Sequence, residues 1–410
     1  MKKLLSRVFG ELRRVEGKSH KKFRPRFEAL EERDLMSVGP EFHINTKVQF
    51  NQHSVAVASQ PAANGGSVAV WADQFNAAGT DIDIRAQRFD GAGNKVGNEI
   101  IVAGSARSET SPSVSMDFRG NFVVVWTDQV SSTNTDIKGQ RFFANGNKNG
   151  GVIAIANSTS REFDADVAMA AGGNFVVSYT VQVGSQQDVH ARRFAANGSF
   201  LSTIVVANSL RNENAASIAM SANGHFSIAY QDELGKFSPG RIQTDIRLKR
   251  FGISGGLIGT HTIANSTQDE GNPDVAMDNF GNTVVVWEHH NSASDRDIDA
   301  RKVLNDGSMG LIMVVDGSTE FQFSPKVAMD MNDGDFVVAY DQQNFVTATH
   351  SLIVREMHRT GSIINSFNLG NASGAAIAIN DSDAYFIAYS AFNRPGDPES
   401  GIRGRRGLLV

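Results

Sequence analysis

Cysteine is absent from this chain of 410 residues, and tryptophan occurs only three times. The lack of cysteine excludes disulfides, thiolate zinc sites, iron–sulfur clusters and a cysteine nucleophile. No stretch approaches the roughly 18 apolar residues that a membrane-spanning helix needs. The P-loop and H-E-x-x-H signatures are also missing, so these two common enzyme classes have no support in the sequence.

Positive charge is scarce in most of the chain and concentrated at its start. Residues 1–26 carry ten Lys or Arg, whereas the chain from residue 38 onward carries 28 Lys or Arg against 38 Asp or Glu. A nucleic-acid-binding domain presents a basic face, so the acidic main part predicts no nucleic-acid partner. The basic leader lacks the apolar run of a secretory signal. It is either a disordered tail or a short amphipathic helix that contacts an anionic membrane transiently.

The end of the leader carries a recognisable segment. RPRFEALEERDLMS (residues 24–37) resembles the LEPR-XLL segment near the N-terminus of large exported proteins of planctomycete-type bacteria. The matching residues are Leu30, Glu31, Arg33, Leu35 and Ser37, whereas Glu32 and Met36 depart from the family pattern. The resemblance implies export to the cell surface or the extracellular space.

One sequence motif recurs throughout the rest of the chain. Residues 114–126 read VSMDFRGNFVVVW, residues 167–179 read VAMAAGGNFVVSY and residues 275–287 read VAMDNFGNTVVVW. A repeat of about 50 residues is typical of propellers and solenoids. The aromatic residues that end the successive copies of the motif are Trp71, Trp126, Tyr179, Tyr230, Trp287, Tyr340 and Tyr389.

Each repeat contains four short pieces with the character of strands. A first apolar piece is followed by a Gly- or Asn-bearing turn and by a continuous apolar run such as FVVVW, which predicts a strand buried on both faces. An alternating piece such as DIKGQRF predicts a third, half-exposed strand. A fourth piece such as IAIANS ends the unit. The pattern therefore predicts an all-β chain built from four-stranded antiparallel sheets.

Seven such sheets around one axis would form a seven-bladed β-propeller. The last repeat lacks a fourth strand, and residues 42–47 near the N-terminus have the character of that missing strand. We therefore expect the N-terminal strand to close the ring, which removes two exposed sheet edges. The competing interpretations are an open β-solenoid and two smaller sheet domains.

The repeats also resemble a pattern found in large secreted bacterial proteins, written roughly VAMDxxGNFVVVWxD…DIxAQRFDxxGxxxG. The resemblance covers nearly all of residues 41–407 and implies an exported protein without implying an activity. We predict two parts, a basic leader with the sorting segment over residues 1–40 and a single propeller over residues 41–410.

Two repeated charged positions are interpreted as structural. An Asp opens the third strand of five repeats, and an Arg or Lys usually follows five residues later. We expect each Arg to cover the neighbouring blade or to pair with Asp73, Asp128 or Asp232. A ring of Ca²⁺-binding carboxylates is the functional alternative for the Asp positions, which are Asp83, Asp136, Asp188, Asp245 and Asp297.

Two acidic stretches are candidate metal sites. DMNDGD at residues 330–335 has the start of a calcium loop but lacks its distal Glu, so a hairpin one residue longer is the alternative. SASDRDID at residues 292–299 is the densest group of potential ligands, and exposed surface charge explains it equally. The candidate Ca²⁺ ligands are Asp295, Asp297, Asp299, Asp330, Asp333 and Asp335.

The sequence favours an interaction scaffold over an enzyme. Variable loops after the second strands, such as residues 130–135 and 289–296, would bind an envelope protein or a polysaccharide. The alternatives are a purely structural envelope component and a propeller hydrolase or lyase that acts on polysaccharide. The enzyme would require Glu288, His289 and Asp232 to converge at the mouth of one channel.

Overall fold

The computed structural model describes residues 38–46, 51–62, 65–74, 81–238, 241–391 and 401–409. Every regular element in these residues is a β-strand, and they form no helix able to cross a membrane. The predictions for the leader, including the LEPR-XLL-like segment, lie outside the described residues.

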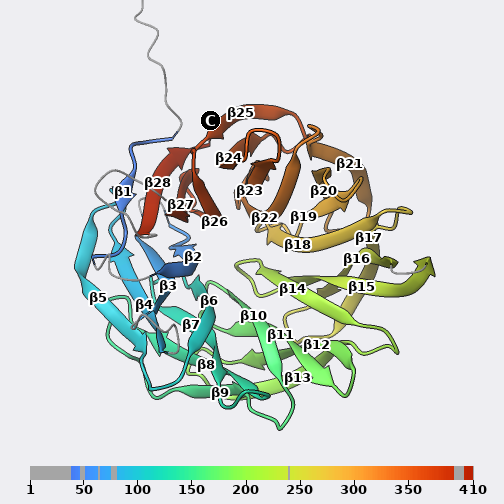
Figure 1. The fold of residues 1–410 in the computed structure, drawn as a ribbon. Helices are drawn as coiled ribbons and strands as arrows, with labels where there is room; N and C mark the ends of the chain where they lie inside the picture. The colour runs from blue at the N-terminus through green and yellow to red at the C-terminus, as the bar shows by residue number, and fades with distance from the viewer. Residues whose placement is uncertain are drawn as a thin grey trace, which may run out of the picture. The chain divides into compact units, whose positions relative to one another are not determined.

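The strands form seven consecutive units, each an antiparallel arrangement of four strands (Figure 1). Unit 1 comprises β2 (Gln52–Ser59), β3 (Ser67–Gln74), β4 (Ile82–Phe89) and β5 (Lys95–Ala103). Unit 2 comprises β6 (Glu109–Met116), β7 (Phe122–Gln129), β8 (Thr135–Phe142) and β9 (Ile153–Ala156). Unit 3 comprises β10 (Glu162–Met169), β11 (Phe175–Val183), β12 (Gln186–Phe194) and β13 (Phe200–Ala207).

The second half of the chain repeats this order. Unit 4 comprises β14 (Glu213–Met220), β15 (Phe226–Ser238), β16 (Arg241–Phe251) and β17 (Leu257–Ala264). Unit 5 comprises β18 (Asp269–Met277), β19 (Thr283–His290), β20 (Arg296–Val303) and β21 (Met309–Asp316). Unit 6 comprises β22 (Phe321–Met329), β23 (Phe336–Asn344), β24 (Thr349–Met357) and β25 (Ile363–Asn368). Unit 7 comprises β26 (Ala372–Ile379), β27 (Ala384–Ala391), β28 (Gly401–Leu408) and, from the start of the chain, β1 (Phe42–His43).

The units follow one another around a common axis, and the first strand of each unit is innermost (Figure 1). Neighbouring first strands pack against each other, and β26 packs against β2 where the two ends of the chain meet. A parallel pairing of Arg296 with Phe321 joins units 5 and 6 into one eight-stranded sheet. The predicted all-β chain of four-stranded antiparallel sheets is confirmed, and the arrangement is propeller-like.

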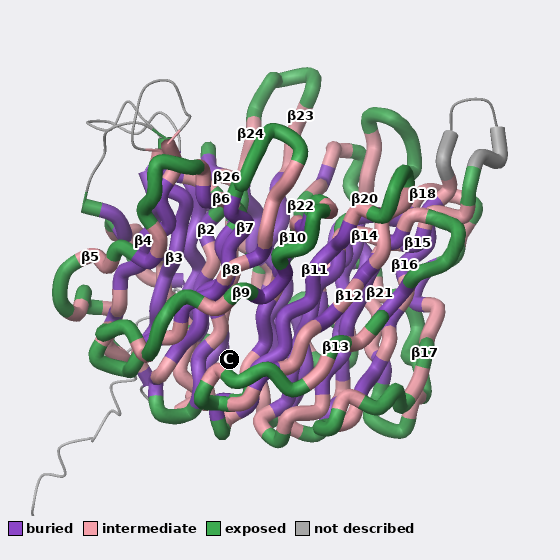
Figure 2. Tube along the Cα trace, turned by 90° about the horizontal axis from the view of Figure 1, so that it is seen from below, coloured by how far each residue is buried: buried purple, intermediate pink, exposed green. Residues whose placement is uncertain are grey.

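Burial follows position within a unit (Figure 2). The second strands are buried along almost their whole length, as their continuous apolar runs predict. The prediction of half-exposed third strands is only partly right, because β4 is mostly buried and the fourth strand β5 is the exposed one. Neighbouring units cover the faces of the third strand, since Ile84 and Ala86 of β4 belong to one buried cluster with Val114 and Met116 of β6. All seven repeated aromatic residues are buried.

The turns after the first strands explain the recurring Asp and Gly letters. The Asp117 carboxylate accepts hydrogen bonds from the backbone N–H groups of Arg119 and Asn121, each at 2.8 Å. Gly120 adopts a φ of 81°, a left-handed conformation that glycine tolerates without strain. In unit 6 the corresponding turn closes from the Asp330 N–H to the Asp335 carbonyl, which makes it the one-residue-longer hairpin that the sequence allows.

Unit 7 differs from units 2, 3 and 4 at one pair of facing residues, where one residue is larger and the other is smaller. In units 2, 3 and 4 a Phe at the start of the second strand stacks on a Phe at the end of the third, as Phe122 does on Phe142 at 4.7 Å between ring centroids. In unit 7 the larger Tyr385 pairs with Gly407, and a Cβ atom at Gly407 would overlap the Tyr385 ring. The small residue therefore makes room for the larger ring.

This exchange predicts that Gly407→Ala is strongly destabilising. The added methyl group must displace the fully buried Tyr385 ring, and such overpacking costs about 3 kcal/mol. Gly151→Ala is the matched control, because no atom lies within 4 Å of its added Cβ and its φ is not left-handed. Urea denaturation should show a lower midpoint for Gly407→Ala only, and equal midpoints for the two variants would contradict the packing argument.

Candidate functional site

A large cavity lies in the central channel of the described residues. Its volume is about 550 Å³, and all seven first strands contribute to its wall. Because the wall is built from one strand of every unit, its chemistry is set by the residues at which the repeats differ.

Each first strand carries an irregularity at the same place. The register shifts between the first and second strands of every unit, and one residue within each shift has a positive φ. In six units the residue is not glycine, and its φ lies between 46° and 54°. A β-bulge of this kind re-aims side chains, and such strained positions cluster at functional sites. The seven residues are Ser54, Ser111, Asp164, Ala215, Asn272, Ser324 and Gly374.

Side chains from the preceding unit stabilise several of these bulges. The Ser324 N–H donates to Glu288 Oε1 at 2.8 Å, and the Gly374 N–H donates to Asp341 Oδ2 at 3.2 Å. Glu288 also accepts hydrogen bonds from Asn272 at 2.6 Å and from Arg296 at 2.6 Å. The bulges are therefore fixed parts of the channel wall.

The Asp341 carboxyl group makes the stability of the folded protein depend on pH. The side chain is 5% exposed, and burial raises its pKa to about 7, with the nearby Glu288 charge contributing in the same direction. Because the pKa is raised in the folded protein, the stabilisation from this group is present below the unfolded pKa and is lost as the pH rises through about 7.

We therefore predict that Asp341→Asn raises the free energy of unfolding at pH 8 by up to about 4 kcal/mol, because the pKa is raised from 3.8 to about 7 and one pKa unit corresponds to about 1.4 kcal/mol. At pH 4 the two proteins should be nearly equally stable. Denaturation curves at both pH values provide the measurement, and a parallel pH dependence in wild type and variant would contradict the assignment.

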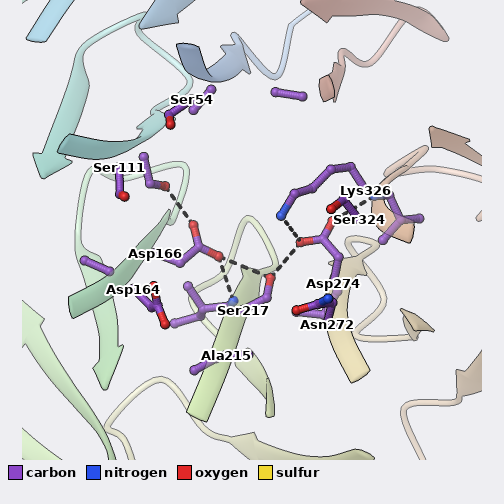
Figure 3. Close-up of a pocket in the computed structure, with 18 of the residues that line it drawn as sticks. Ser54, Ser111, Asp164, Asp166, Ala215, Ser217, Asn272, Asp274, Ser324 and Lys326 are labelled. Carbon is purple, nitrogen blue, oxygen red and sulfur yellow. Dashed lines mark hydrogen bonds and ion pairs between the residues drawn. The ribbon is translucent and has the colours of Figure 1, made fainter. Parts of the chain in front are cut away.

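A chain of polar side chains crosses the channel wall (Figure 3). Asp166 accepts hydrogen bonds from Ser113 at 2.7 Å and from the Ile218 N–H at 2.9 Å. Ser217 lies between two carboxylates, 3.2 Å from Asp166 Oδ2 and 3.0 Å from Asp274 Oδ1. Its single hydroxyl hydrogen can serve only one of them at a time.

Asp274 is the second charged member of this chain. Lys326 Nζ lies 3.5 Å from its Oδ1 atom, and the Val327 N–H donates to its Oδ2 atom at 2.8 Å. Burial raises the pKa of the Asp274 carboxyl, and the adjacent Asp274 charge raises the pKa of the Lys326 ammonium. The Lys326 side chain is 49% exposed to the cavity, so this cation can reach a bound molecule.

Asp164 differs from the other carboxylates in the wall. It occupies the bulge position that holds a small neutral residue in every other unit, and its side chain is exposed to the cavity. No hydrogen bond or ion pair within 4 Å joins its carboxyl group to another described residue. The channel walls withdraw the group from bulk water and raise its pKa, an effect that Arg161 and Lys326 only partly oppose. Asp164 is therefore an available carboxyl group that can hold a proton.

The repeated Asp and Arg positions lie elsewhere, between the strands of the units. Arg85 lies close to Asp73 and 3.6 Å from Asp83, and Arg247 joins Asp232 to Asp245 in the same way. The Arg five residues after the Asp instead contacts the next unit, as Arg250 does through the Asn305 carbonyl at 2.9 Å. Of the two alternatives that the sequence left open for this Arg, the contact with the neighbouring unit is the one observed.

The candidate calcium ligands do not form a ready-made metal centre. Asp297 and Asp299 lie on β20, and Asp299 faces His289, whose Nδ1 atom is 4.0 Å from its Oδ2 atom. Asp330 and Asp333 bind backbone N–H groups of their own turn. Within the described ranges, no three His, Asp or Glu side chains are grouped to hold a metal ion. Calcium binding at Asp295, Asp297, Asp299, Asp330, Asp333 or Asp335 stays a prediction.

The three residues nominated for an enzyme site do not converge. Asp232 pairs with Arg211 and Arg247. Glu288 contacts the channel wall, whereas His289 points to the other face of β19 and contacts Glu270 at 3.1 Å. Consecutive residues of a strand face opposite sides, so Glu288 and His289 could not have met.

The sequence analysis missed Asp164, Asp166, Asp274 and Lys326. Their signal is the stretch just before the repeated VAM letters, which reads DAD in unit 3, NPD in unit 5 and SPK in unit 6. These residues differ from one repeat to the next, so a comparison of the recurring residues does not reveal them.

No protein-family model and no curated protein sequence matches this chain. Solved structures do match it in fold. A lectin from Burkholderia pseudomallei has a TM-score of 0.58 and 12% identity, over 88% of this chain and 99% of the lectin. An ulvan lyase bound to -[GlcA(1-4)Rha3S]- has a TM-score of 0.55 and 11% identity, over 90% and 96% of the two chains. An α-L-arabinofuranosidase of Fusarium graminearum with arabinobiose has a TM-score of 0.51 and 10% identity, over 91% and 98%. At these identities the likeness establishes the fold alone, which is a β-propeller.

Proposed function

We propose that this protein is an exported seven-bladed β-propeller that cleaves a polysaccharide at the mouth of its central channel. The observation that carries the proposal is Asp164, an available carboxyl group with a raised pKa in the wall of a large cavity. Groups of this kind act as general acids in glycoside cleavage.

The proposed closed ring of seven blades is supported by the pairing of the two ends of the chain. Phe42 pairs with Gly404, and the Ile44 N–H donates to the Ile402 carbonyl at 2.9 Å. The proposed export is supported by the resemblance of residues 24–37 to the LEPR-XLL segment.

The proposed reaction is hydrolysis of a glycosidic bond. Asp164 donates its proton to the bridging oxygen as the bond to the anomeric carbon breaks, and water adds to that carbon. The Asp274 carboxylate, oriented by Lys326, accepts the proton of the water. Each turnover leaves Asp164 ionised and Asp274 protonated, and proton exchange with solvent restores both groups.

The similar folds favour a carbohydrate as the substrate. The three solved structures described above are a lectin, a polysaccharide lyase and an arabinofuranosidase, and two of them carry a bound saccharide. This support is at the level of fold, so the choice of sugar rests on the residues of the channel.

Binding without cleavage is the second candidate. Asp166 and Asp274 each accept several hydrogen bonds from the wall itself, and carboxylates held in this way favour a wall that binds a sugar without reacting with it. This function corresponds to the interaction scaffold that the sequence favours.

One experiment separates the two candidates. The purified chain is incubated with a panel of bacterial and algal polysaccharides, and both retention on immobilised polysaccharide and release of new reducing ends are measured. Cleavage that is lost in Asp164→Asn while retention persists supports the hydrolase. Retention without release supports the binding module, and the absence of both from the whole panel contradicts both candidates.

A further inference from the structure

A second, smaller pocket opens beside the channel. Its volume is about 280 Å³, and it is bounded by the loop between β7 and β8 and by the start of β10. Ser111 and Asp164 line both this pocket and the channel cavity. A chain of sugar residues bound at Asp164 can therefore continue from one cavity into the other.

The wall of the side pocket suits sugar hydroxyl groups. Hydroxyl and amide side chains, including those of Gln129, Ser131 and Thr133, make up most of it. The Thr127 hydroxyl and the Asn134 amide oxygen have no hydrogen-bond partner among the described residues, although both atoms are buried. Buried polar groups usually have partners, so these two atoms favour a polar ligand in the pocket.

Arg161 gives the pocket a positive charge. Its guanidinium carbon lies 5.3 Å from the centroid of the Phe163 ring, which holds the cation in place by a cation–π contact. Its side chain is exposed, and it forms no ion pair within 4 Å among the residues that the structure describes. Arg161 and Asp164 are the only charged residues in the pocket wall, so the cation is free to pair with a ligand carboxylate.

This arrangement is particular to unit 3. The first-strand stretch reads REFD at residues 161–164, whereas the corresponding stretches of the other units contain no Arg or Lys, as in SETS at residues 108–111 and NENA at residues 212–215. Arg161 and Asp164 are therefore two departures from the repeat within four residues, whereas Phe163 has a counterpart in Phe323 of unit 6. A feature that served only the blade would be expected to recur.

We propose that the side pocket is a second sugar subsite that selects an acidic sugar residue, a uronate, through Arg161. This inference rests on the proposed function and specifies its substrate as an acidic polysaccharide. The uronate carboxylate pairs with the guanidinium, the hydroxyl-rich loop binds the ring hydroxyls, and the next glycosidic bond lies at Asp164.

The test uses the full chain and two probes, oligogalacturonate and oligoglucuronate, each compared with its carboxyl-reduced neutral form. Calorimetric titration should show that wild type binds at least one acidic probe about tenfold more tightly than its neutral form. Added salt should reduce the preference, because exposed charges are screened. Arg161→Gln should abolish the preference, so that the acidic and neutral forms bind this variant equally.

Arg119→Gln is the matched control, because Arg119 is exposed in the turn between β6 and β7 and lines neither cavity. It should retain the preference. Equal binding of acidic and neutral forms by wild type, or a preference that survives in Arg161→Gln, would overturn the subsite and leave the proposed function standing. Failure of wild type to bind or cleave any polysaccharide of the wider panel would instead overturn the proposed function itself.

Discussion

Asp164→Asn should lower the rate of polysaccharide cleavage at least 100-fold. A general acid contributes typically about 10²–10⁴-fold to a rate, and Asn cannot donate an acidic proton to the leaving oxygen. The substitution is nearly isosteric, and the carboxyl group forms no hydrogen bond or ion pair within the described residues that Asn would break. The variant should therefore fold normally and still bind polysaccharide.

The pH dependence distinguishes an acid from a residue that only positions the substrate. Because Asp164 must be protonated to act, wild-type activity should fall as the pH rises through its raised pKa. Asp306→Asn is the control, since Asp306 lies in the turn between β20 and β21 and is not part of either cavity wall. Activity of Asp164→Asn within tenfold of wild type, with an unchanged pH profile, would show that Asp164 is not the acid.

Ile44→Ala should cost about 3 kcal/mol of unfolding free energy, although Ile44 lies near the N-terminus. Its side chain is fully buried in a cluster that includes Trp71, Ala388 and Ile402. Removing a buried Ile side chain beyond the β-carbon costs about 2–5 kcal/mol. The contact joins residues some 350 positions apart, so it also offsets the entropy of closing a very long loop.

Leu210→Ala controls for a general loss of apolar surface, because Leu210 is 91% exposed. Urea denaturation should show a lower midpoint for Ile44→Ala and no change for Leu210→Ala. Equal midpoints would mean that the N-terminal segment does not complete unit 7 in solution, and the proposed closed ring would then be wrong.

Much of the fold could be predicted from the sequence because a repeated unit states its pattern several times. The buried second strands follow from runs such as FVVVW. The turns follow from the recurring Asp, which accepts hydrogen bonds from backbone N–H groups, and from the recurring Gly, which adopts a positive φ. The exposure of the third strands could not be judged from their alternation alone, because it depends on how closely the neighbouring unit packs on them.

The candidate site could not be predicted from the sequence, and the reason is physical. The bulges that shape the channel hold Ser, Ala, Asn and Asp at positive φ. Only Gly374 is a glycine, the residue type that most strongly predicts such a conformation. The partners Asp166, Ser217 and Asp274 come from three different units, and only the packing of neighbouring first strands brings them together. By contrast, the opposite faces of Glu288 and His289 followed from strand geometry and could have been foreseen.

The most direct test of the central claim is a crystal structure of Asp164→Asn with an oligosaccharide that the wild-type chain cleaves. The account predicts a sugar residue in the channel mouth, with a glycosidic oxygen within hydrogen-bond distance of residue 164 and the adjoining sugar near Asp274 and Lys326. A sugar bound only on the outer strands or loops, with the channel mouth free of it, would contradict the account.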